Sequence, residues 1–183
     1  GCGKSTVVNL IPRFYDVTEG SVLVDGKDVR EVKQSELRDR IGYIPQKGNL
    51  FTGTIGTNLR IADENAPDET LVEAINVAQA AEFVFEDKEA EGLETPISQG
   101  GMNVSGGQKQ RLAIARALVK RPPIYIFDDS FSALDFKTDS ALRKALHEKM
   151  GDSTVLIVTQ RVATVKNADQ IIVLDDGRVV GKG

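Results

Sequence analysis

The sequence contains few of the residues on which several classes of protein depend. Among 183 residues there are one cysteine, Cys2, one histidine, His147, and no tryptophan. A single thiol cannot form a disulfide within the chain, which is consistent with a reducing compartment. No apolar run approaches the roughly 20 residues that a membrane-spanning helix needs. The formal net charge of -4 is not that of a typical nucleic-acid-binding domain, and we expect no nucleic acid among the partners.

The rest of the composition is that of a globular protein, with 40% hydrophobic and 27% charged residues. Apolar periodicity and turn signals predict helices at 5–14, 68–91, 106–120, 136–150 and near 162. They predict strands at 20–24, 41–44, 124–127, 154–158, 170–174 and 179–180. Strands that alternate with helices favour an α/β fold with a mostly parallel sheet. The acidic helical stretch indicates an inserted helical subdomain over about 60–120.

The first six residues match the end of a phosphate-binding loop that runs from a strand into a helix: Gly1, Cys2, Gly3, Lys4, Ser5 and Thr6. Glycines let backbone N–H groups approach phosphate oxygens closely, and the lysine adds a positive charge. The alternative is a glycine turn before a surface helix. The chain has no initiator Met and begins inside this motif, so we expect it to be a fragment of a longer protein.

An acidic residue ends the apolar run at 124–127. The carboxylate of Asp128 would lie at the carboxyl edge of a buried sheet, where ligand sites of α/β proteins are found. This position suits a ligand of Mg²⁺. The alternative is an aspartate that caps the following turn.

A helix rich in Ala and Leu opens with Ser105, Gly106, Gly107 and Gln108. A hydroxyl and backbone N–H groups at the start of a helix form an anion site. The simpler interpretation is helix capping by Ser105. Both interpretations hold together if the anion comes from a second molecule.

These three segments, which follow one another along the chain at 1–6, 105–108 and 124–128, resemble those of ATP-binding cassette (ABC) ATPase domains, and the resemblance extends over nearly all of 1–183. The segments Arg13-Phe14-Tyr15-Asp16 and Leu50–Ile55 resemble the exporter type most closely. The resemblance implies a P-loop NTPase core that begins here inside the phosphate loop, with ATP and Mg²⁺ as cofactors. It also implies two partners, a second nucleotide-binding domain and the transmembrane domain of an exporter, at the cytoplasmic face of the cell membrane.

The resemblance also assigns roles to single residues. Residues Gly1–Thr6 would contact the phosphates, with Lys4 on the β- and γ-phosphates. Mg²⁺ would be held by Ser5, Gln46 and Asp128. The four residues Ser105–Gln108, called the signature below, would close over ATP that a facing domain holds. Asp135 ends the motif Ser132-Ala133-Leu134-Asp135, which matches the D-loop and contacts nucleotide in the family.

Two catalytic positions depart from the family pattern. The glutamate expected after Asp128 is Asp129, which is one methylene shorter, and the histidine of the switch loop is Gln160. A displacement of roughly 1 Å in a catalytic group costs on the order of 100-fold in rate. Glutamine can donate a hydrogen bond but cannot become positively charged. With Gln46, these residues make up the predicted catalytic set.

Both departures together resemble the degenerate half of a heterodimeric exporter, in which this chain's signature serves its partner's site. One alternative is a homodimeric exporter with reduced ATPase activity at both sites. Another is an ABC protein of translation or DNA repair that transports nothing. The exporter-like segments Arg13–Asp16 and Phe51–Ile55 argue against this last alternative.

Overall fold

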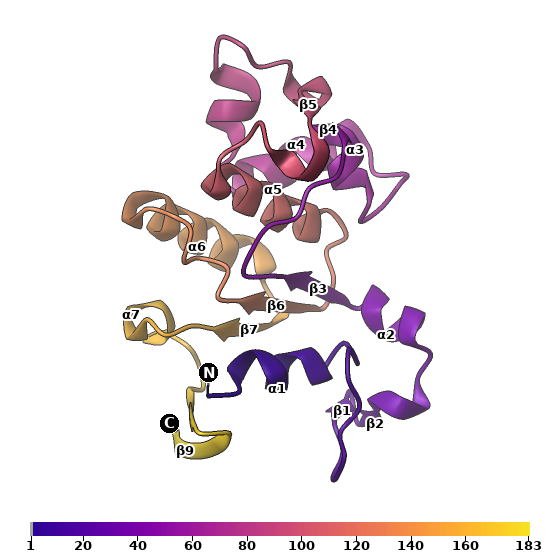
Figure 1. The fold of residues 1–183 in the computed structure, drawn as a ribbon, viewed down its shortest axis with the longest axis vertical. Helices are drawn as coiled ribbons and strands as arrows, with labels where there is room; N and C mark the ends of the chain where they lie inside the picture. Colours follow the sequence, from indigo (N-terminus) through magenta and orange to yellow (C-terminus); the bar gives the residue numbers. More distant parts are fainter. Residues whose placement is uncertain (1) are drawn as a thin grey trace.

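A parallel sheet of three strands forms the centre of the computed structural model, which describes residues 2–183 (Figure 1). The strands are β3 (Ile41–Ile44), β6 (Ile124–Asp128) and β7 (Thr154–Val158), in the order β3-β6-β7. The middle strand β6 is buried from its second residue onward, as expected for a parallel strand covered on both faces. The α/β fold and the parallel sheet predicted from the sequence are confirmed.

Successive residues of β6 point to opposite faces of the sheet and belong to different parts of the core. Ile126 packs with Val8 of α1 (Lys4–Leu10) in one cluster. Phe127 packs with residues of α5 (Gly106–Val119) and α6 (Phe136–Met150) in the other. Helix α1 therefore covers one face of the sheet and α5 covers the other.

The helices beyond α5 differ in part from the prediction. Helix α4 (Asp68–Val77) ends where Gln79 takes a φ of 58°, which a right-handed helix cannot contain. A π-helical turn (Glu82–Glu86) follows, so the prediction of one helix over 68–91 is wrong in its second half. Helix α3 (Ile55–Arg60) was not predicted, because six residues are too few for a helical period to show.

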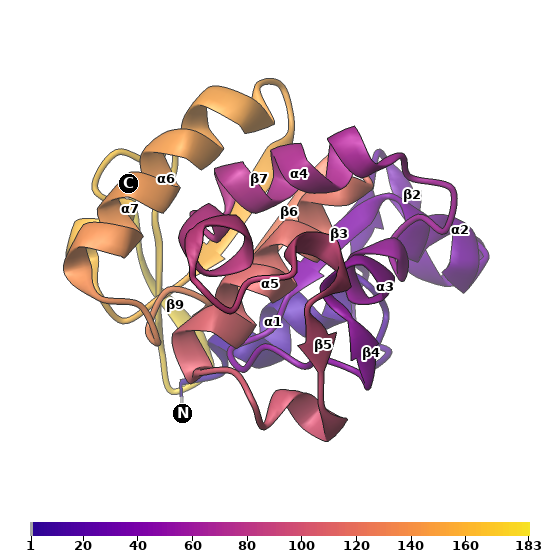
Figure 2. The same ribbon diagram turned by 90° about the horizontal axis from the view of Figure 1, so that it is seen from above.

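Short elements complete this end of the molecule. Strands β4 (Gly53–Thr54) and β5 (Pro96–Ile97) pair antiparallel. Two 3₁₀ turns, Gly92–Glu94 and Gln99–Gly101, flank β5 and lead to α5. Figure 2, seen from this end, shows α4 between α3 on one side and α6 on the other.

At the opposite end, two hairpins lie beyond α1 (Figure 1). Strands β1 (Leu23–Val24) and β2 (Lys27–Asp28) pair antiparallel, and the turn residues Asp25 and Gly26 both have positive φ, as predicted for this turn. The second hairpin joins β8 (Ile172–Asp175) to β9 (Arg178–Lys182).

The remaining helical elements are short. A 3₁₀ turn (Val29–Glu31) and α2 (Gln34–Asp39) lead into β3, and α7 (Val162–Val165) follows β7. Helix α1 is shorter than the predicted 5–14, since Arg13 takes a φ of 56° and turns the chain. None of the helices within residues 2–183 is both long enough and apolar enough to cross a membrane.

Candidate functional site

The start of α1 meets the carboxyl end of β6. The hydroxyl of Ser5 donates a hydrogen bond of 2.8 Å to Oδ1 of Asp128, although 123 residues separate them in the chain. Asp128 is only 8% exposed and is the last residue of its strand. A hydroxyl and a carboxylate are the oxygen ligands that Mg²⁺ prefers, and Mg²⁺ takes its other ligands from phosphates and water. The residues present therefore fit a magnesium ion that arrives with a nucleotide.

The phosphate loop leads directly into α1. Gly3 is the N-cap residue, and its φ of 88° lies in the left-handed region that favours glycine. The ammonium group of Lys4 donates to the thiol of Cys2 at 2.8 Å, and this hydrogen bond lowers the pKa of the thiol. Ser5 and Thr6 in the first turn are exposed. Gly1, the other predicted phosphate contact, lies outside the described residues.

Two of the predicted catalytic residues contact each other. Gln46 follows β3, and its side-chain amide donates to Oδ2 of Asp129 at 3.1 Å. Asp129 has a φ of 49°, a conformation in which aspartate is more common than glutamate, and its N–H donates to the carbonyl of Val158. Gln160 follows two residues after Val158 and is exposed. The loops after all three strands of the sheet thus carry predicted catalytic residues.

The structure adds a residue that the sequence analysis missed. The hydroxyl of Tyr43, on β3, lies 3.2 Å from Oδ2 of Asp128 and 2.7 Å from Oδ1 of Asn9 on α1. Burial and the nearby carboxylate raise the pKa of this hydroxyl. One signal was available, because a tyrosine within an apolar strand needs a partner for its hydroxyl.

The signature begins α5 on the other face of the sheet from α1 (Figure 1). Ser105 and Gln108 form a capping box in which each side chain accepts from the other's backbone N–H, at 3.2 and 2.9 Å. Helix capping, the simpler interpretation of Ser105, is therefore present. The structure does not bring the signature together with Lys4 and Ser5.

The D-loop segment lies beside the signature. A Cβ atom placed on Gly107 would be 3.5 Å from the carbonyl oxygen of Ala133, so a side chain at Gly107 would lie against this segment. Asp135 caps α6, accepting from the N–H of Thr138 at 2.9 Å and from its hydroxyl at 2.7 Å. The signature and the segment that ends in Asp135 thus lie side by side.

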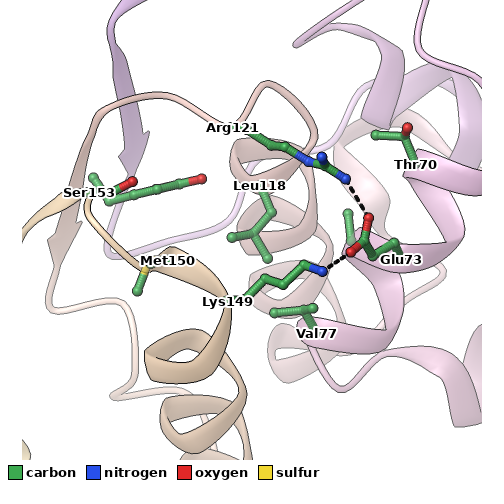
Figure 3. A pocket seen from close by; sticks show the side chains of 10 residues that line it. Thr70, Glu73, Val77, Leu118, Arg121, Lys149, Met150 and Ser153 are labelled. Atoms are coloured by element: carbon green, nitrogen blue, oxygen red, sulfur yellow. Dashed lines mark hydrogen bonds and ion pairs between the residues drawn. The ribbon is translucent and has the colours of Figure 1, made fainter.

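A pocket of about 150 Å³ lies elsewhere, between α4 and the ends of α5 and α6 (Figure 3). Glu73 accepts from Arg121 at 2.5 Å and also pairs with Lys149. The hydrogen bond from Lys149 is the main reason that the pKa of Glu73 is lowered. No predicted nucleotide or metal contact lines this pocket, so it belongs to the junction between α4 and the sheet-bearing part of the chain.

The fold and this placement of residues define an ABC-type ATPase domain. Residues 1–132 match the family described as ABC transporter, and the chain belongs to that family.

Relatives and a solved structure support the same conclusion. An uncharacterised ABC transporter ATP-binding protein of Mycobacterium tuberculosis is 51% identical over the whole chain. A Staphylococcus aureus protein named as a multidrug export ATP-binding/permease protein is 42% identical over the whole chain. The chain spans 31% of the length of each. The structure of a bacterial Atm1-family ABC exporter with ATP bound superposes with a TM-score of 0.94 at 38% identity, covering all of this chain and 32% of that one.

Proposed function

We propose that this chain is the nucleotide-binding part of an ABC exporter and that it binds Mg-ATP through Lys4, Ser5, Gln46 and Asp128. The contact between Ser5 and Asp128 carries this proposal, because it joins the phosphate loop to the carboxylate of β6. Lys4 supplies the charge for the β- and γ-phosphates. When bound, Mg²⁺ neutralises part of the phosphate charge.

At this site we infer slow hydrolysis. Asp129 stands where a carboxylate would accept the proton of the attacking water, and its side chain reaches one methylene less far than glutamate. One of its oxygens also accepts from Gln46. Gln160 can donate a hydrogen bond to a γ-phosphate but cannot carry the charge of an imidazolium. Both features favour a degenerate site in a heterodimer.

The signature serves the partner's site in this proposal. The capping box uses the N–H of Gln108, and the N–H groups of Gly106 and Gly107 belong to the first helical turn, which has no intrahelical acceptors. These groups are free to donate to the phosphates of ATP held by a facing domain. The position of the signature, on the other face of the sheet from α1, supports a contact in trans.

A second surface suits the transmembrane part of an exporter. Phe51 and Ile61 are each 57% exposed. Arg116 lies over the Phe51 ring, 6.0 Å from its centroid, and lines the same hollow as Ile61. Its Nη1 is buried without a hydrogen-bond partner among residues 2–183. The S. aureus relative is named as both ATP-binding protein and permease. We infer that this surface faces the membrane domain and that the chain lies at the cytoplasmic face of the membrane.

A homodimeric exporter with two slow sites is the second candidate, since the departures at Asp129 and Gln160 are compatible with it. A role in translation or DNA repair receives no support from the relatives, one of which is named for export.

Nucleotide titration of the complete nucleotide-binding domain tests the assignment. Lys4→Ala removes the charge that pairs with the phosphates, so ATP affinity should fall by at least about tenfold, the equivalent of one charge-assisted hydrogen bond. Lys47→Ala, a change at an exposed lysine, is the matched control. An unchanged affinity in Lys4→Ala contradicts the assignment.

A further inference from the structure

The two carboxylate oxygens of Asp128 have separate partners. Oδ1 accepts from Ser5, and Oδ2 lies 3.2 Å from the hydroxyl of Tyr43. Asp128 is 8% exposed, so these contacts are made largely away from bulk water. A buried carboxylate held at both oxygens cannot rotate about its last torsion without losing one of the two hydrogen bonds.

The hydroxyl of Tyr43 has two neighbours but only one proton. It lies 2.7 Å from Oδ1 of Asn9 on α1, which is nearer than Oδ2 of Asp128 at 3.2 Å. The hydroxyl can serve both neighbours if Asn9 turns its amide and donates to the tyrosine oxygen. A chain of hydrogen bonds then runs from Asn9 through Tyr43 to Asp128.

The ring of Tyr43 is fixed by a second set of contacts. The ring of Phe14 meets it edge to face, with centroids 5.3 Å apart and an angle of 71°. The guanidinium of Arg38 lies 5.3 Å above the Phe14 ring and also donates to the carbonyls of Pro12 and Arg13. Tyr43 therefore keeps its place even if its hydroxyl loses a partner.

We propose that Tyr43 is a positioning residue for the magnesium site: its hydroxyl holds Oδ2 of Asp128 so that Oδ1 remains directed at Ser5. This inference rests on the proposed function, in which Ser5 and Asp128 hold the metal. Tyr43 contacts the carboxylate, and it is not among the residues proposed to bind the phosphates. Its loss should therefore weaken the part of ATP binding that depends on Mg²⁺ and leave the metal-free part unchanged.

Tyr43→Phe in the full-length protein isolates the hydroxyl, because the ring and its contact with Phe14 are retained. Tyr125→Phe is the matched control. Tyr125 is a buried tyrosine of the neighbouring strand β6, with its ring 6.4 Å from that of Phe127, and it lines the pocket beside α4. Each variant is titrated with ATP by calorimetry, once with excess Mg²⁺ and once with EDTA.

We expect Tyr43→Phe to bind ATP like the wild type in EDTA and to lose roughly five- to tenfold of the gain in affinity that Mg²⁺ provides, as for a typical side-chain hydrogen bond. Tyr125→Phe should match the wild type in both titrations. Equal gains from Mg²⁺ in Tyr43→Phe and wild type overturn the positioning role, as does an equal loss with and without the metal. A wild type whose ATP affinity does not respond to Mg²⁺ overturns the proposed metal site itself.

Discussion

The side-chain amide of Gln46 donates a hydrogen bond of 3.1 Å to the carboxylate of Asp129. The two residues follow neighbouring parallel strands, β3 and β6, so the sheet itself places them side by side. In the proposed function Asp129 would activate water, and Gln46 would bind Mg²⁺. This hydrogen bond links the side chain assigned to metal binding with the one assigned to water activation. It also shows that Oδ2 of Asp129 is directed toward Gln46.

We predict that Asp129→Glu together with Gln160→His raises ATP turnover at this site, by up to the order of 100-fold. The longer side chain restores the roughly 1 Å of missing reach, and the imidazole restores a group that can be charged. Steady-state ATPase activity of the complete transporter is the measurement, with the partner's own site inactivated.

Each single variant serves as a control for the pair. The φ of 49° at residue 129 suits aspartate better than glutamate, so thermal unfolding must show that the double variant is folded. A folded double variant with no gain in turnover would count against the degenerate-site interpretation.

A second prediction concerns the reactivity of Cys2. Its thiol accepts a hydrogen bond from Lys4, which lowers the pKa, so more thiolate is present at neutral pH than for a free cysteine. Lys4→Ala should raise the pKa again and slow alkylation by iodoacetamide several-fold at pH 7.5. Mass spectrometry of the peptide that contains Cys2 follows the reaction.

Alkylation of Cys2 also reports nucleotide binding. Saturating Mg-ATP should slow the wild-type reaction, because Lys4 then pairs with phosphate and the loop is covered. Equal rates in wild type and Lys4→Ala over pH 6–9 would show that the contact between these two side chains does not govern the thiol.

The third prediction concerns stability at the junction shown in Figure 3. Glu73→Gln removes the charge that pairs with Arg121 and Lys149, and it should cost no more than about 1 kcal/mol, since these side chains are partly exposed. Leu71→Ala, two residues earlier on α4 and fully buried, should cost about 2–5 kcal/mol. Urea unfolding of the complete nucleotide-binding domain measures both.

The pH dependence of the free energy of unfolding distinguishes the ionic contribution of Glu73 from the packing contribution of Leu71. The pKa of Glu73 is lowered in the folded protein. Its contribution to stability is therefore fully present at pH values above its ordinary pKa of 4.5, and it is lost as the pH falls below that value. The difference between wild type and Glu73→Gln should therefore shrink below pH 4.5, whereas that of Leu71→Ala should not. A difference for Glu73→Gln that stays constant with pH would refute the ionic origin.

Much of the central fold could be predicted because its signals are local. The apolar run that ends in Asp128 marks a buried strand and its edge, and Asp25-Gly26 marks a tight hairpin turn. The break at Gln79 could not be predicted, since glutamine rarely takes a positive φ. In the structure, the carbonyl of Gln79 accepts from Arg111 of α5. Six-residue α3 is too short to show a period, and its capping box of Thr54 and Thr57 lacks the usual glutamate.

Residues of the candidate site that belong to sequence motifs could be predicted. Contacts that depend on how the strands and helices pack could not. The phosphate loop and Asp128 follow from spacing and residue type. The link from Tyr43 to Asp128 depends on the register of β3 beside β6, in which Tyr43 pairs with Ile126, and on the position of α1. A single sequence does not give this register.

The central claim is that this chain's signature serves a facing ATP site while its own site is slow. Ser105→Ala with Gly107→Asp would remove a donor from the partner's nucleotide and place a carboxylate against its γ-phosphate. Like charges at such short range repel strongly in a water-poor site. Asp129→Asn removes the carboxylate at a position that, in this account, contributes little to turnover.

The most direct measurement is the ATPase and transport activity of the reconstituted heterodimer carrying each of these variants on this chain. We predict that the signature variant abolishes most of both activities and that Asp129→Asn leaves much of both. The opposite ranking, with Asp129→Asn the more damaging change, would contradict the account and show that this chain's own site performs the hydrolysis.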